Sequence, residues 1–206
     1  MKRRLLPILM TLVLVCALPI WAAFVTSGDV TNPLVCTAGA TLPDLQAKID
    51  AAEDNATITL DADTTITETL VITGKTLTLD LNGCTLRMTG KRSVLCVYNG
   101  ATLTITDSST AKSGTITGGN ATDGGGVYIG GNSSEGHLVM TGGTITGCHV
   151  SSRGGGVLVY NGSFTMSGTA RITNCTAAGG GGVVVHTGAS TFTMNGGEIS
   201  DCKAFY

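Results

Sequence analysis

The sequence is short of the residues that most domains use for a bulky core and a charged surface. Aromatic residues make up 4% of the chain and charged residues 13%, and there is one tryptophan. The core must therefore come from Val, Ile, Leu and Met. No cluster of basic residues follows position 4, so the sequence lacks the basic patch that nucleic-acid binding requires.

Glycine and threonine are the residues that the chain has in excess. There are 30 glycines and 33 threonines among 206 residues, and apolar residues reach 42%. Glycine favours turns, whereas threonine and short aliphatic runs favour strands. We therefore expect one domain that is rich in strands and turns.

The N-terminal segment, residues 1–23, carries the pattern of a secretory signal peptide. Basic residues 2–4 precede an apolar stretch over residues 5–18, and Pro19, Ala22 and Ala23 follow. The alternative is an uncleaved anchor, but the apolar run is short for a membrane span. Cleavage leaves 9 basic and 14 acidic residues, a mildly acidic chain. We expect an exported protein, secreted or at the cell surface, that meets the membrane only through this signal.

Three blocks of sequence recur from about residue 114 onward, as repeat architectures require. The blocks are Gly-Gly-Gly-Val at 124, 154 and 180, an alternating block at 138–140, 164–166 and 192–194, and Ile-Thr/Ser-x-Cys at 145, 172 and 199. The last block advances by the same step both times. Weaker copies stand at 77–79, 103–105 and 115–117.

Each repeat contains three short segments that alternate apolar and polar residues, which is typical of strands. Such strands cannot bury one face alone, but coiling the chain places each about 4.8 Å above its equivalent. The sequence therefore predicts an all-β right-handed parallel β-helix over residues 54–206, with three strands in each coil of about 27 residues. An antiparallel sandwich is the alternative, but a sandwich does not predict that the same residue type recurs about every 27 positions along the sequence.

A short helix is expected before the coils, over residues 41–53, after a linker over residues 24–40. Thr41 is the expected N-cap, and Leu42, Leu45, Ile49 and Ala52 fall on one helical face. Such a helix covers the open end of the first coil. No equivalent cap follows Asp201, so the β-helix is expected to be truncated at its C-terminal end.

The glycine triplets have two possible interpretations. One is a phosphate-binding loop, but the Lys-Ser/Thr pair that such a loop needs is missing and strands follow instead of helices. The other is a tight turn, which we favour. The turn glycines are Gly124, Gly125, Gly126, Gly154, Gly155, Gly156, Gly180, Gly181 and Gly182.

Three cysteines recur at one position of the repeat. Cys148, Cys175 and Cys202 are evenly spaced by one repeat and are expected to stack as a buried structural column. A disulfide within this column is the alternative. Cys84 and Cys96 are a further possible pair.

Outward-facing residues supply the candidate contact surface. Tyr128, Leu158 and Val184 are expected to point outward in one column as an exposed apolar stripe. Thr78, Thr104, Thr165 and Thr193 form another outward column, interrupted by Val139, which raises ice binding as a minor alternative.

These blocks resemble bacterial surface proteins with right-handed parallel β-helix repeats of the pectin-lyase-like superfamily, in particular adhesin-like and polymorphic outer-membrane-protein repeats. The resemblance rests on Gly-Gly-Gly-Val and on Ile-Thr-Asn-Cys, with Cys where those repeats usually carry Asn. It implies a surface or secreted protein that acts as an adhesin-like or structural binding module. A glycan or a host or cell-surface protein is the partner that this implies.

The alternative function is a polysaccharide lyase or glycoside hydrolase on the same scaffold. Either needs carboxylates that converge on one outward face. The acidic residues instead fall at scattered registers, and only Arg171 and Glu198 share one, as a surface ion pair. His137, His149 and His186 are out of register with one another. We therefore predict no catalytic residue, no metal site and no cofactor.

Overall fold

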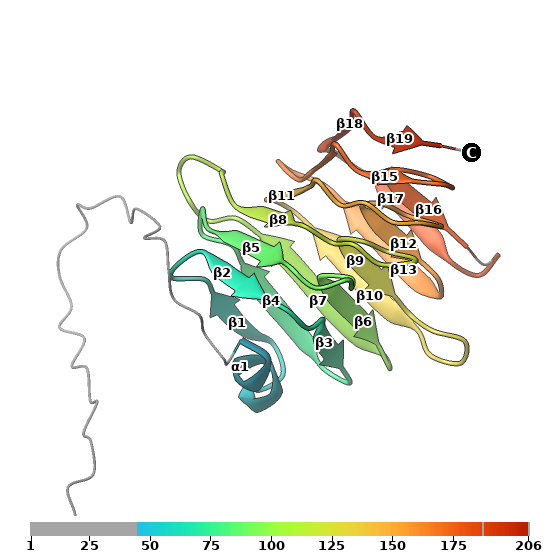
Figure 1. The fold of residues 1–206 in the computed structure, drawn as a ribbon. Coiled ribbons are helices and arrows are strands. Elements are labelled where there is room, and N and C mark those ends of the chain that lie inside the picture. The colour runs from blue at the N-terminus through green and yellow to red at the C-terminus, as the bar shows by residue number, and fades with distance from the viewer. Residues whose placement is uncertain (1–44, 187, 206) are drawn as a thin grey trace, which may run out of the picture. The chain divides into compact units, whose positions relative to one another are not determined.

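The computed structural model describes residues 45–186 and 188–205 of the chain. The predicted signal peptide and linker lie outside these residues. Within the described part the chain coils through three parallel sheets, A, B and C, in that order (Figure 1). The fold is an all-β parallel solenoid of five coils and the start of a sixth. No helix among the described residues is long and apolar enough to cross a membrane.

Each sheet contains one strand from each coil. Sheet A has the order β1-β4-β7-β10-β13-β17 and contains Ala56–Thr59, Thr76–Asp80, Ala101–Thr106, Gly136–Met140, Gly162–Met166 and Thr191–Met194. Sheet B has the order β2-β5-β8-β11-β14-β18 and contains Thr64–Ile66, Thr85–Met88, Thr115–Thr117, Thr144–Thr146, Arg171–Thr173 and Glu198–Ser200. Sheet C has the order β3-β6-β9-β12-β16 and contains Leu70–Thr73, Leu95–Tyr98, Val127–Ile129, Val157–Val159 and Val183–Val185. Two short strands, β15 (Thr176–Ala177) and β19 (Lys203–Ala204), pair in the connection that follows sheet B.

The register of the coils confirms the predicted repeat. Ile145 pairs with Ile172, and Ile172 pairs with Ile199, in parallel strands. Leu77 likewise pairs with Leu103. Every strand pair in the three sheets is parallel, so the antiparallel sandwich is excluded. The right-handed sense of the coil stays a prediction.

The core consists of columns of identical or similar side chains inside the coil. Alternation along each strand turns one set of residues inward, and the parallel register stacks each set on the next coil. Sheet A, for example, stacks Leu77, Leu103, Leu138, Phe164 and Phe192, and the two phenylalanine rings are stacked with centroids 4.9 Å apart. Most inward residues are fully buried, which is worth about 1.5–3 kcal/mol for each large aliphatic side chain.

Helix α1 (Leu45–Ala51) covers the N-terminal end of the coil, as predicted, and it ends two residues before the predicted position 53. Leu45 and Ile49 are buried against the first coils. Leu45 and Ile49 thus take the inward positions expected of them, and Ala52 packs beside them. The predicted N-cap Thr41 and the predicted apolar residue Leu42 lie outside the described residues.

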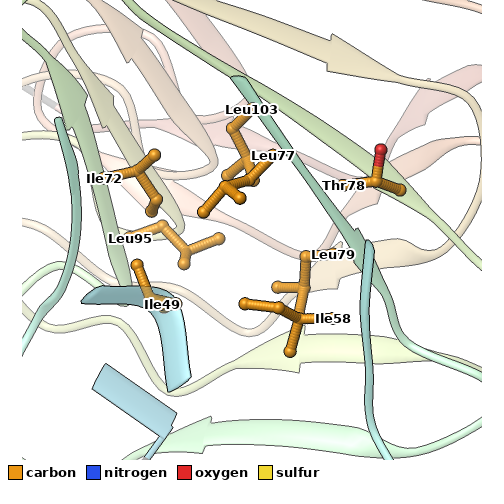
Figure 2. A pocket seen from close by; sticks show the side chains of 8 residues that line it. All are labelled: Ile49, Ile58, Ile72, Leu77, Thr78, Leu79, Leu95 and Leu103. Atoms are coloured by element: carbon orange, nitrogen blue, oxygen red, sulfur yellow. The ribbon is translucent and has the colours of Figure 1, made fainter. Parts of the chain in front are cut away.

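The core directly under α1 is slightly loose. An apolar gap of about 10 Å³ lies there, which is at or below the volume that one water molecule needs. Figure 2 shows Ile49 of α1 pointing toward Ile72, Leu77 and Leu95, whereas Thr78 lies on the other side of its strand. Because this gap is small and lined by the core, it is a packing feature under the cap and no ligand site.

Candidate functional site on the outer face of sheet C

The predicted outward column exists, but it is not exposed along its length. Tyr128 pairs with Leu158 and Leu158 with Val184 across sheet C, and Cys96 extends the column by one coil. Tyr128 and Val184 are half-buried, whereas Leu158 has an exposed fraction of 0%. The prediction of an exposed apolar stripe is therefore wrong at its centre.

An arginine from one end of β12 joins three successive coils. The guanidinium of Arg153 donates from Nε and from one terminal nitrogen to the two carboxylate oxygens of Asp123, each at 3.2 Å. Its other terminal nitrogen lies 2.6 Å from Nε2 of His186. The backbone amide of Arg153 also donates to Asp123, at 2.9 Å. Asp123, Arg153 and His186 belong to consecutive coils, so this side chain runs along the axis of the solenoid.

Tyr160, at the other end of β12, also contacts the coils before and after its own. The ring of Tyr160 stacks on Tyr128 with centroids 5.9 Å apart, and it meets the ring of His186 edge-on at 4.6 Å. The Tyr160 hydroxyl donates to the side-chain oxygen of Asn132 at 2.6 Å. Tyr160 is thus fixed by ring contacts on the coils before and after its own.

Leu158 is fully buried although it points outward. Arg153 and Tyr160 flank β12, and Leu158 is the outward residue between them. The backbone of the turn also lies close, because a Cβ on Gly154 would come within 2.9 Å of the Leu158 Cβ. The centre of the outer face is therefore buried, and it lies between Arg153 and Tyr160, the residues that connect neighbouring coils.

The rings lie in two adjacent columns: Tyr128 is in the predicted one, whereas Tyr98, Tyr160 and His186 stand two residues beyond it, where the third coil has Gly130. The amide of His186 donates to the carbonyl of Val159, which places His186 beside Tyr160. Tyr98 occupies the equivalent strand end in the second coil, where it is 37% exposed. We call Tyr98, Tyr128, Tyr160 and His186 the aromatic ridge: each of four successive coils supplies one ring, and the rings of the last three are in contact.

The charges of the site are held in fixed states. Burial by itself raises the pKa of Asp123, but hydrogen bonds from Arg153 and Ser152 and the charge of Arg153 outweigh it and lower this pKa below its usual value. The carboxylate raises the pKa of Arg153 in turn. Burial and the neighbouring Tyr160 raise the pKa of Tyr128, so its hydroxyl stays neutral. The ion pair is therefore intact at neutral pH.

Arg153 retains donors for a ligand. A guanidinium has five N–H groups, and the contacts with Asp123 and His186 use three of them. Within residues 45–186 and 188–205, no acceptor engages the other two. The side chain of Arg153 is 37% exposed, so these donors are accessible from solvent.

The cysteine column is present and reduced. Cys148 and Cys175 are fully buried and Cys202 is half-buried, and none of the three forms a disulfide. The amide of Lys203 donates to the carbonyl of Cys175, which confirms the predicted register. The predicted pairing of Cys84 with Cys96 is not formed, because Cys84 lies in the core and Cys96 lies on the outer face of sheet C.

The glycine triplets form tight turns. Gly124, Gly154 and Gly180 have φ values of 60°, 68° and 67°, which favour glycine strongly. The third glycine of a triplet packs on the next coil, since a Cβ on Gly126 would lie 2.5 Å from Ile145 and 2.6 Å from the carbonyl of Gly156. The triplets lead directly into the strands of sheet C.

Several of the other acidic residues in the described part of the chain contact backbone amides or surface arginines. Arg171 and Glu198 form the expected ion pair at 2.8 Å, with about half of each side chain exposed. Asp63, Asp80 and Asp107 accept hydrogen bonds from backbone amides of neighbouring turns. His137 and His149 each contact a hydroxyl of the next coil. Among the described residues, no three His, Cys, Asp or Glu side chains lie close enough to hold a metal ion.

Threonine columns cover the outer face of sheet A. One column runs through Thr57, Thr78, Thr104, Val139, Thr165 and Thr193, and the next through Thr76, Thr102, His137, Ser163 and Thr191. The sequence predicted the first column from Thr78 onward and missed the second. Val139 and His137 interrupt the two columns in the same coil.

Sequence reasoning singled out Tyr128 and missed its partners. Arg153 and Asp123 precede the strands, and Tyr160 and His186 follow them, where period-two alternation no longer assigns a face. One signal was available, because Tyr98, Tyr160 and His186 each stand two residues beyond a member of the outward column. No protein-family description, no curated protein and no solved structure matches the chain.

Proposed function

We propose that this protein is an exported, adhesin-like binding module that holds a glycan on the outer face of sheet C. The observation that supports this is the aromatic ridge of Tyr98, Tyr128, Tyr160 and His186, with Arg153 in contact with its last ring. Rigid aromatic rings and arginine are the residues that most often dominate the affinity of a binding surface. No other outward face of the described coils gathers rings in this way.

The chemistry of the ridge suits a sugar chain. The exposed parts of the rings offer apolar surface with polar edges, which matches a pyranose that is apolar on its faces and polar at its rim. The free N–H groups of Arg153 and the side chain of Asn132 offer hydrogen bonds to hydroxyl groups. Because one ring follows another at each coil, affinity is spread along the solenoid axis instead of being focused in one pocket.

The alternative of a lyase or hydrolase has less support from this surface. Asp123 is the carboxylate at the ridge, and Arg153 engages both of its oxygens. Glycoside hydrolysis needs a second carboxylate within about 10 Å on the same face of the sugar site. A binding surface needs none.

The test is a glycan-array screen with the full chain, followed by calorimetric titration of the best glycan. Tyr160→Ala removes the central ring and Arg153→Gln removes the charge, and we expect each to weaken binding at least about tenfold. Tyr160→Phe keeps the ring and should retain most of the affinity. Thr146→Ala, on the outer face of sheet B, is the matched control and should bind as the wild type does.

Two results would contradict the proposal. One is a chain that binds no glycan on the array. The other is a glycan whose affinity is unchanged in both Tyr160→Ala and Arg153→Gln. Release of unsaturated or reducing ends from polygalacturonate by the wild type would support the enzyme alternative instead.

The threonine columns of sheet A support a second candidate, ice binding. They place hydroxyl and methyl groups in register at about 4.8 Å between coils, on a face whose described residues include no Phe, Tyr or Trp. Thr104→Lys should then abolish inhibition of ice recrystallisation, and Thr146→Lys on sheet B should not. A wild-type chain without effect on ice recrystallisation would remove this candidate.

A further inference from the structure

The cysteine column differs from the other inward columns in its chemistry and in its access to solvent. Cys148 and Cys175 are fully buried, whereas Cys202 is partly exposed. A small reagent therefore reaches the column only through Cys202. Cys175 lies directly behind it, one coil away.

The two sulfur atoms are close enough to bond. Cys175 and Cys202 share a parallel register, since the amide of Lys203 donates to the carbonyl of Cys175 at 2.9 Å. Neighbouring parallel strands lie about 4.8 Å apart, inside the Cα separation of about 4.4–6.8 Å that disulfides span. The thiol of Cys202 also leans toward the preceding coil, where Sγ donates to the carbonyl of Ile172 at 3.7 Å. The side chains of Cys175 and Cys202 are in hydrogen-bond contact.

We propose that Cys202 and Cys175 form a redox site, in which a small external disulfide converts the two thiols into a disulfide between adjacent coils. The bridge joins the connections that follow β14 and β18, and it therefore fastens the sixth coil to the fifth. Cys148 is left as a buried thiol below the bridge.

The reaction balances as two thiol–disulfide exchanges. The Cys202 thiolate attacks the disulfide of the reagent, a new S–S bond forms, and one reagent thiolate leaves. The Cys175 thiolate then attacks the Cys202 sulfur of this mixed disulfide, and the second reagent thiolate leaves. The protein loses two protons and two electrons, and the reagent gains them as two thiols.

The environment of each thiol sets the conditions for this reaction. Burial raises the pKa of Cys202, and the hydrogen bond with Cys148 together with burial raises the pKa of Cys175. Both exchanges need a thiolate, so the rate should increase as the pH rises from about 7 to 9. The hydrogen bond from Cys175 lowers the pKa of Cys148, but no external disulfide reaches that sulfur.

The experiment treats the folded chain with oxidised glutathione at pH about 8.5, and then maps its peptides by mass spectrometry without reduction. We expect a cross-linked peptide pair that contains Cys175 and Cys202 and has lost two hydrogens. We also expect amide hydrogen exchange in Lys203 and Phe205 to slow at least about tenfold, because these two amides donate to the carbonyls of Cys175 and Ala177 and the bridge holds β19 on β15. In Cys175→Ala, Cys202 should instead retain one glutathione.

Three results would overturn the proposal. The first is a wild-type chain in which Cys202 stops at the mixed disulfide with glutathione. The second is a cross-link between Cys148 and Cys175. The third is an unmodified Cys202 in a chain whose Cys96 has reacted, because Cys96 is another partly exposed thiol and reports that the reagent was active.

Discussion

The side-chain amide of Gln46 pairs with both backbone polar groups of Val71. The amide of Val71 donates to Oε1 of Gln46 at 2.8 Å, and Nε2 of Gln46 donates to the carbonyl of Val71 at 3.0 Å. Val71 belongs to β3, the edge strand of sheet C at the end that α1 covers. One glutamine thus supplies the donor and the acceptor that a further strand would have supplied. Figure 1 shows α1 at this end of the stack, next to β1 and β3.

A glutamine that completes a sheet edge should contribute measurably to stability. We expect Gln46→Ala to lower the free energy of unfolding by about 1–2 kcal/mol, because two hydrogen bonds are lost in a partly buried place. Chemical denaturation with urea measures this difference. Lys48→Ala is the matched control, since Lys48 is exposed on the same helix, and it should change the stability by less than about 0.5 kcal/mol. Equal stability of the two variants would show that Gln46 does not cap the sheet.

Whether Leu158 is buried or exposed can be tested by its contribution to stability. If the side chain is buried, Leu158→Ala leaves a cavity and should cost about 2–4 kcal/mol. Val184→Ala, in the same column but half-buried, should cost less than half as much. Thermal unfolding followed by circular dichroism provides the comparison. A Leu158→Ala chain as stable as the wild type would place this residue in solvent.

The packing of the glycine triplets gives a prediction with an internal control. Gly126→Ala places a Cβ 2.5 Å from Ile145 and 2.6 Å from the carbonyl of Gly156. We expect a loss of about 1–3 kcal/mol, because the next coil must move away. Gly131→Ala meets no atom within 4 Å and should leave the melting temperature unchanged. Similar melting temperatures for both variants would contradict the close stacking of the coils.

Asp107 should make stability depend on pH. Its side chain is buried, and its carboxylate accepts hydrogen bonds from the amides of Gly83, Ser109 and Gly114 and from the Ser109 hydroxyl. Burial alone raises the pKa of Asp107, but these hydrogen bonds outweigh it and lower the pKa below its usual value. The stabilisation is therefore complete above the unfolded-state pKa of about 3.9 and is lost as the pH falls through the folded-state value.

The measurement is the unfolding free energy of wild type and Asp107→Asn between pH about 7 and 2. Asp107→Asn should be about 1–3 kcal/mol less stable at neutral pH, since an amide cannot accept all four bonds. The difference between the two chains should shrink as the pH falls. A difference that stays constant with pH would mean that the charge of Asp107 has no part in stability.

The sequence predicted the fold because the repeat is carried by residues whose environment recurs. Ile145, Ile172 and Ile199 occupy one inward column, so the same shape and polarity are needed again at a fixed step. The helical cap was predictable for a similar reason, since Leu45 and Ile49 are one turn apart and face one core. The first coil was harder to recognise, because it is shorter than the later ones. Ala56 of β1 already pairs with Leu77, whereas Leu77 pairs with Leu103 in the next coil.

The candidate site was harder to predict, because it depends on contacts across coils and outside the strands. Alternation placed Tyr128 and Leu158 on the outer face, but it could not show that Leu158 is buried there or that Arg153 from the preceding turn joins Asp123 to His186. His186 is out of register with the other histidines, and its contact with Tyr160 is what connects it to the ridge. Side chains at strand ends point where the turn directs them, and the turn geometry follows from backbone angles that no residue pattern specifies.

The parallel register of the coils is the central claim, and methyl nuclear Overhauser effects measure it most directly. In a chain with ¹³C-labelled isoleucine methyl groups, Ile145 should show contacts to Ile116 and to Ile172, and Ile172 should show contacts to Ile199. Ile116 and Ile172, two coils apart, should show none. A spectrum without contacts between Ile145 and Ile172 would contradict the stacked solenoid and everything built on its outer faces.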